Sequence, residues 1–163
     1  MTLHERLHAA LIDAMRAKDA LRRDVLRMAE AAIYTVEKRD RRELSDDEVV
    51  VILAREVKAR RESIEAFRGG GREDLAAKEE AEIAILVEFL PRQLTDDELR
   101  ALVDETIAET GATSVKDLGR VMGRLSPKTR GRADGKRTSE LVAQALARRE
   151  LDAHDAPATH GGG

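Results

Sequence analysis

The segment SDDEVVVILAREVKARRESIEAFRGGG (residues 45–71) indicates the fold class of this chain most clearly. It begins with a capping box, in which the Ser45 hydroxyl can accept a hydrogen bond from a first-turn amide and Glu48 can reach back to the cap. Three glycines end it, because glycine tolerates the left-handed conformation of a helix C-cap. Between these signals, apolar residues recur at helical spacing: Val50, Leu53, Val57, Ile64 and Phe67. The segment therefore predicts one long amphipathic helix.

The same start signal recurs on both sides of this segment. Residues 2–5 and 95–98 have the same capping-box spacing, and Asp19 and Ser114 are candidate single caps. No segment alternates apolar and polar residues with period two, so no strand is expected. We therefore predict an all-α protein.

Four longer helices are expected before Pro91 and three shorter ones after it. The other apolar faces expected before Pro91 are Leu3, Leu7, Leu11 and Ala14; Leu21, Val25, Met28, Ala32 and Val36; and Leu75, Ile83, Leu86 and Leu90. The shorter helices are expected at residues 95–109, at 114–125 with Pro127 closing the helix, and at 134–150. We predict an N-terminal four-helix region (residues 1–91), a small C-terminal three-helix domain (92–150) and a disordered tail (151–163).

The composition of the 163 residues excludes several classes of protein. With 42% hydrophobic residues the chain can form a packed core, so wholesale disorder is excluded. It has no cysteine, which excludes disulfides, a thiol nucleophile and zinc–thiolate sites. It has no apolar run long enough to span a membrane, and its N-terminus is typical of a helix start instead of a signal peptide. We therefore expect a cytoplasmic protein.

Residues that could support catalysis or metal binding are scarce. The four histidines lie near the two ends of the chain, without an evident nucleophile and orienting acid. His4 and His8 share a helix face but have no third ligand nearby, so we interpret them as solvated side chains. Residues 69–72 lack the Lys-Ser/Thr of a phosphate-binding loop and are interpreted as a turn. We predict no catalytic residue, no metal site and no cofactor.

Positive charge is concentrated in residues 112–137, although the whole chain has a net charge of −3. This window contains eight Lys or Arg residues and only two acids, Asp117 and Asp134, so it carries +6 against −9 for the rest of the chain. Such local asymmetry predicts an anionic partner. The candidate RNA-binding residues are Arg120, Arg124, Lys128, Arg130, Gly131, Arg132 and Lys136.

The glycines of this window indicate how an anion could be held. Gly131 and Gly135 bracket a predicted turn whose backbone amides could face a phosphate beside the basic side chains. No aromatic residue follows Phe89, so unpaired bases would have no stacking platform, and contacts to the backbone of structured RNA are expected instead. The alternative is a solvated loop whose glycines, including Gly119 and Gly123, serve only helix packing.

Ordered motifs in both parts of the chain match those of one known family. In the second part they are residues 89–95 (FLPRQLT), 97–99 (DEL), 118–123 (LGRVMG), 128 (K), 131–136 (GRADGK) and 140–142 (ELV). In the first part they are residues 55–58 (REVK), 63–67 (SIEAF) and 71–75 (GREDL). Together they resemble the GatB/YqeY family, and specifically its stand-alone YqeY-like members. The resemblance extends to about residue 147.

This resemblance implies an all-α fold and kinship with the tail domain of GatB, one of the subunits of the glutamine-dependent aminoacyl-tRNA amidotransferase. That enzyme converts Glu-tRNA or Asp-tRNA to the amide form, and the GatB tail helps to hold the tRNA. The family-level label is therefore a carbon–nitrogen ligase with glutamine as amido-N-donor. The resemblance implies tRNA contacts at Lys128, Arg130, Gly131, Arg132 and Lys136.

The chain lacks a counterpart of the ATP- and metal-binding catalytic region of GatB, and it lacks the Ser-Ser-Lys machinery of the amidase. We therefore expect a non-catalytic module that binds or handles tRNA, and we do not expect it to act as an amidotransferase by itself. The alternative is a protein-interaction module that docks on an amidotransferase or another translation enzyme through its acidic, amphipathic first four helices.

Overall fold

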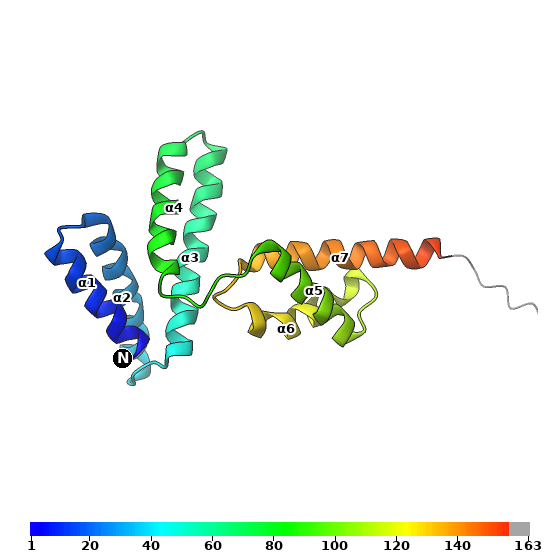
Figure 1. Cartoon of the computed structure of the whole chain (residues 1–163), viewed down its shortest axis with the longest axis horizontal. Coiled ribbons are helices and arrows are strands. Elements are labelled where there is room, and N and C mark those ends of the chain that lie inside the picture. The colour runs from blue at the N-terminus through cyan, green and yellow to red at the C-terminus, as the bar shows by residue number, and fades with distance from the viewer. Residues whose placement is uncertain (157–163) are drawn as a thin grey trace, which may run out of the picture. The chain divides into compact units, whose positions relative to one another are not determined.

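The computed structural model describes residues 1–156, and every regular element in this range is a helix (Figure 1). The prediction of an all-α fold is confirmed. The first part of the chain forms α1 (Leu3–Arg16), α2 (Ala20–Asp40), α3 (Asp46–Gly69) and α4 (Glu73–Val87). The second part forms α5 (Asp96–Thr110), the short 3₁₀ helix η1 (Val115–Asp117), α6 (Leu118–Thr129) and α7 (Gly135–Asp155).

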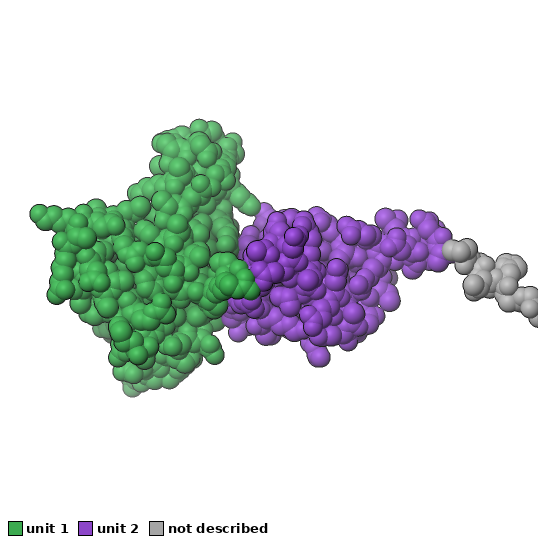
Figure 2. Space-filling view, viewed as in Figure 1, with its two compact units in different colours: residues 1–93 green, residues 94–163 purple. Residues whose placement is uncertain are grey.

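The chain divides into two compact units, Met1–Gln93 and Leu94–Gly163 (Figure 2). In the first unit α1 packs against α2 and α3 packs against α4, so that two helical hairpins form (Figure 1). In the second unit α5, α6 and α7 each contact the other two. Each unit encloses its own apolar core. The centre of the second core consists of Val103, Ile107, Val121, Leu125, Val142 and Leu146.

The helix starts follow the local sequence closely. The three predicted capping boxes are all present, with Thr2, Ser45 and Thr95 as N-caps. Asp19 caps α2 through its side chain, as predicted. Ser114 does more than a single cap, because it forms a fourth capping box with Asp117 at η1. Local capping chemistry therefore determines where most of these helices begin.

The buried face of α2 is displaced around the helix axis from the face predicted from the sequence. Val25, Leu26, Ala29 and Ile33 are its buried residues. Met28, predicted to face the core, is 55% exposed. The reason is that α2 packs against α1, α3 and α4 at once, so its buried surface is not the single stripe expected for a helix with one neighbour. The predicted face of α1 is confirmed, since all four of its residues are buried.

Two helices of the second unit extend past their predicted ends. Pro127 does not close α6, which continues to Thr129. Leu125 and Thr129 are buried, and their packing outweighs the one backbone hydrogen bond that a proline nitrogen cannot donate. Likewise, α7 continues through Asp155, so residues 151–155 are helical instead of belonging to a tail. The rest of the predicted disordered tail, residues 157–163, lies outside the described residues.

One arginine is buried inside the first unit. Arg60 on α3 is only 5% exposed. Its Nε donates to Glu82 Oε2 on α4 at 3.0 Å, and its Nη1 donates to Glu56 Oε2 on α3 at 3.0 Å. Its Nη2 lies 3.9 Å from the sulfur of Met28 on α2. The Arg60 guanidinium therefore links three helices, mainly through charge-assisted hydrogen bonds.

Candidate nucleic-acid interface

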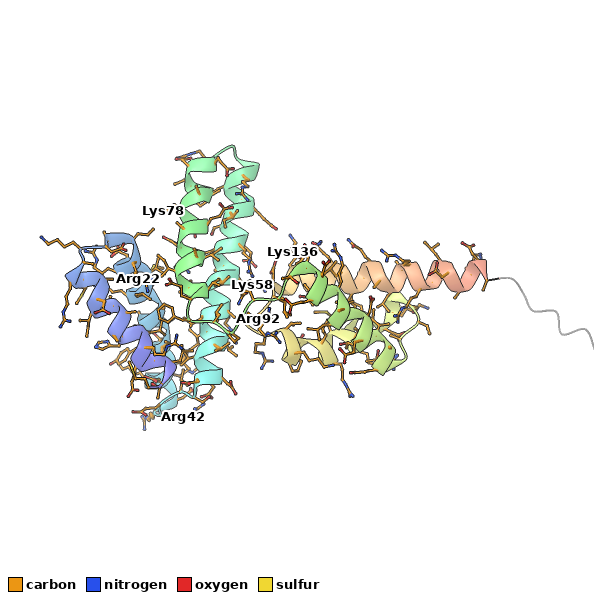
Figure 3. All side chains as sticks on the ribbon, in the orientation of Figure 1. Arg22, Arg42, Lys58, Lys78, Arg92 and Lys136 are labelled. Carbon is orange, nitrogen blue, oxygen red and sulfur yellow. The ribbon has the colours of Figure 1, made fainter. Side chains whose placement is uncertain are left out.

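The second unit separates negative from positive charge by helix. The α5 helix contains six acids and one base, whereas α6 contains three bases and no acid. Arg130 and Arg132 follow α6 directly, and Lys136 lies at the start of α7 (Figure 3). The candidate interface is therefore α6 together with the turn at residues 130–136, and we refer to these residues as the basic segment.

The bases of α6 share one side of the helix. Arg120, Arg124 and Lys128 are four residues apart, which places them in a row along the helix surface. Gly119 and Gly123 adjoin this row, and a Cβ added at either glycine would meet no described atom within 4 Å beyond its chain neighbours and the nearby backbone of α6 itself. These two glycines are therefore not required for packing within the described chain. They leave the helix backbone open beside the bases.

Glu109 on α5 holds two of these bases. Its Oε2 lies 3.0 Å from the Nζ of Lys128 and 3.8 Å from the Nε of Arg124. All three side chains are at least one-third exposed, so the ion pairs are weak and their bases can exchange to another anion. Glu109 is a determinant that sequence reasoning missed, because it lies outside the basic window and reaches it only through the packing of α5 on α6.

Asp117 engages Arg120 at the start of α6. The backbone amides of Thr113 and Ser114 donate to Asp117 Oδ2 at 2.9 and 3.3 Å. These two hydrogen bonds hold the pKa of the Asp117 carboxyl below its ordinary value, and the positive charge of Arg120 adds a smaller contribution in the same direction. Arg120 places Nη2 3.3 Å from Asp117 Oδ1, and its Nη1 donates to the Thr110 carbonyl at 2.9 Å. Arg120 therefore also has a structural role.

The turn after α6 differs from its predicted form. Gly131 has a φ of 72°, in the left-handed region that favours glycine, but it is buried. Gly135 does not bracket the turn, because it is the first residue of α7. The backbone carbonyl of Arg132 accepts a hydrogen bond from the Leu94 amide at 2.8 Å. The side chain of Arg132 donates through Nη1 to the Lys128 carbonyl at 3.4 Å. Side chains, and not the Gly131 amide, are the groups that this turn presents.

Two bases of the second unit are less engaged than the others. Arg130 and Lys116 are both exposed, and neither side chain forms an ion pair or hydrogen bond within residues 1–156. Arg130 belongs to the predicted set. Lys116 does not, although its position four residues before Arg120 could have pointed to it. The structure thus divides the predicted bases into a free one, Arg130, and several that are tethered.

The histidines of the first unit form pairs with α2. His4 Nδ1 lies 3.5 Å from Glu37 Oε1, and His8 Nδ1 lies 2.9 Å from Glu30 Oε1. Within residues 1–156 no group of three or more His, Cys, Asp or Glu side chains could hold a metal ion. Among the same residues, no helix has the length and apolar character needed to cross a membrane.

Comparison with known proteins places this fold and its basic segment in a family. The model of the YqeY-like proteins matches residues 4–146, which include parts of both units. The chain belongs to the YqeY-like family. The resemblance inferred from the sequence motifs is therefore confirmed for the YqeY-like members, and the basic segment of this YqeY-like chain lies entirely within the matched residues.

Two relatives of the YqeY-like chain come from fungi. It is 30% identical over 146 residues to "Altered inheritance of mitochondria protein 41, mitochondrial" of Pyrenophora tritici-repentis, an alignment that covers 86% of this chain and 79% of the relative. It is 31% identical over 86 residues to an uncharacterised protein of Schizosaccharomyces pombe, which covers 53% of this chain and 70% of that protein.

Proposed function

We propose that this YqeY-like protein binds folded tRNA through its second unit, by phosphate contacts from the basic segment. The observation that carries the proposal is the separation of charge, which leaves α6 with three bases and no acid. Phosphate contacts supply most of the sequence-independent affinity of proteins for nucleic acids. The proposed contacts are Arg120, Arg124, Lys128, Arg130, Arg132 and Lys136, with Gly131 shaping the turn.

The chemistry of the second unit favours a structured RNA over a single strand. No Phe, Tyr or Trp follows Phe89, so the unit lacks the large aromatic side chains that form stacking platforms for unpaired bases. Long, exposed Lys and Arg side chains can instead contact the phosphates along a folded duplex arm of the RNA, which proteins recognise by its shape. Such contacts carry no base information, and we expect similar affinities for unrelated tRNAs.

The salt dependence of tRNA binding tests this proposal. The six proposed phosphate contacts give a slope of roughly −4 to −5 when the logarithm of the association constant is plotted against the logarithm of the salt concentration. An electrophoretic shift assay with the full chain and folded tRNA at several salt concentrations measures the slope. Absence of binding at low salt, or binding that does not respond to salt, would contradict phosphate recognition by this surface.

The protein is expected to be inactive as an amidotransferase by itself. We expect no amidated product when the purified chain is incubated with glutamine, ATP, Mg²⁺ and a mischarged tRNA. The reason is that the sequence offers no activated nucleophile and no phosphate-activating motif. Chromatography of the aminoacyl group after deacylation checks this. Turnover that depends on side chains of this chain would refute the expectation.

A second candidate function is docking on an amidotransferase or another translation enzyme. The first unit has a net charge of −2, and the exposed side of its α1–α2 hairpin is hollowed. Pull-down of the amidotransferase subunits with the full chain tests this candidate directly. Both candidate functions require a compartment in which translation takes place, and we propose the cytoplasm.

A further inference from the structure

The exposed side of the α1–α2 hairpin carries two adjoining hollows that share His4 and His8. One has a volume of about 440 Å³, and its apolar lining residues are the half-buried Ala9, Ile12 and Leu44. The other, of about 370 Å³, is bordered by residues of α2 that include Ala31 and Tyr34. We refer to the two hollows together as the α1–α2 groove. All of its lining residues belong to the first unit.

The rim of the α1–α2 groove is acidic. Four carboxylates line it, from Glu5, Glu30, Glu37 and Glu43, against one base, Arg27. Glu30 and Glu37 are fixed in place, because each lies beside a histidine and Glu37 Oε1 also accepts a hydrogen bond from the Leu44 amide at 3.1 Å. An anionic ligand such as RNA would be repelled here, whereas cationic side chains would be attracted.

Tyr34 gives the groove an exposed aromatic anchor. Its side chain is 62% exposed, whereas Phe89 is buried at 7%. The Tyr34 hydroxyl has no hydrogen-bond partner among the described residues. Tyrosines in such positions are enriched at the energetic centres of protein interfaces. Met15 on α1 and Met28 on α2 are also exposed, so large apolar side chains on the surface of the first unit gather on this hairpin.

We propose that the α1–α2 groove binds a basic, amphipathic helix of a protein partner. An apolar lining with an acidic rim matches a helix that presents Leu-like residues on one side and Lys or Arg beside them. This proposal specifies the partner chemistry for the second candidate function and does not depend on RNA binding by the second unit. The two can fail separately, because they concern different units and ligands of opposite charge.

The composition of the chain provides a local reporter for this groove. Tyr34 is the only tyrosine and there is no tryptophan, so tyrosine emission arises from the groove alone. The probe is an 18-residue helical peptide of Leu and Lys without Tyr or Trp, added to the full chain at about 0.15 M salt, where long-range attraction is screened. We expect the peptide to shield Tyr34 from acrylamide quenching, and a twin peptide with Glu in place of Lys to have no effect.

Two arginine substitutions separate docking from general charge attraction. Ala31→Arg fills an exposed position at the border of the groove and should weaken binding of the Lys peptide by on the order of tenfold or more, as expected for loss of an interface centre. Ala101→Arg on α5 makes the same charge change at an exposed site of the other unit and should leave binding within about twofold. Circular dichroism checks that both variants keep their helicity.

The proposal is overturned by several definite results. The first is that the Lys peptide leaves acrylamide quenching of Tyr34 unchanged. The second is that the Glu peptide shields Tyr34 as well as the Lys peptide does. The third is that the Ala31→Arg variant binds the Lys peptide as tightly as the parent protein. Shielding of Tyr34 that increases with protein concentration in the absence of peptide would assign the groove to a second copy of this chain, which also overturns the proposal.

Discussion

Replacement of Arg60 by alanine is expected to lower the free energy of unfolding of the first unit by about 3 kcal/mol, because it leaves the partner carboxylates of a buried ion pair without their counter-charge. Glu82 is the more buried partner, with its side chain 14% exposed. Urea unfolding followed by Tyr34 emission measures the effect specifically in the first unit, since this unit contains the only tyrosine.

Two further variants show whether the ion pair is responsible. Arg55→Ala removes an exposed arginine from the same helix and should change stability by less than about 0.5 kcal/mol. Glu82→Gln added to Arg60→Ala removes the stranded charge and should restore part of the loss. If Arg60→Ala is no more destabilising than Arg55→Ala, the buried network does not hold α3 and α4 together.

Simultaneous replacement of four bases by alanine should reduce tRNA affinity by on the order of a hundredfold at 0.15 M salt, because four phosphate contacts are lost. The four bases are Lys128, Arg130, Arg132 and Lys136. The slope of the salt dependence should also flatten by roughly 3 units, which leaves the contribution of Arg120 and Arg124, and the loss of affinity should be similar for unrelated tRNAs. Fluorescence anisotropy with labelled tRNA measures both quantities.

A matched variant controls for net charge. It replaces four exposed bases of the first unit by alanine and so makes the same charge change away from the basic segment: Arg16, Lys38, Arg55 and Lys58. We expect this control to keep most of the affinity. Circular dichroism and melting must show that the first variant remains folded, since its unit is small. A folded variant that binds tRNA as well as the parent would refute the site assignment.

The sequence was sufficient for those features of the fold that depend on neighbouring residues. The capping box at Ser45 and Glu48 involves atoms three residues apart, so the start of α3 could be predicted without its surroundings. The exposure of Met28 and the continuation of α6 past Pro127 could not, because both depend on how many helices pack on α2 and on which α6 residues are buried.

The candidate site was predictable only in part for the same reason. The row of Arg120, Arg124 and Lys128 follows from helical spacing alone. The contact of Glu109 with two of these bases does not, since Glu109 is 19 residues from Lys128 in the sequence and comes close only when α5 packs on α6. The burial of Gly131 likewise depends on tertiary packing that no local pattern reports.

The most direct test of RNA binding by the basic segment is the tRNA affinity of the Glu109→Gln variant. Loss of binding can result from misfolding, but a gain cannot. Removal of this carboxylate frees Lys128 and Arg124 from their ion pairs. We therefore expect the affinity for tRNA to rise several-fold and the slope of the salt dependence to become steeper by up to about one unit. Glu105→Gln, the same change one turn earlier on α5 at a residue that forms no ion pair within residues 1–156, should have a smaller effect. Unchanged or weaker binding by a folded Glu109→Gln variant would contradict the proposal that this surface binds phosphates.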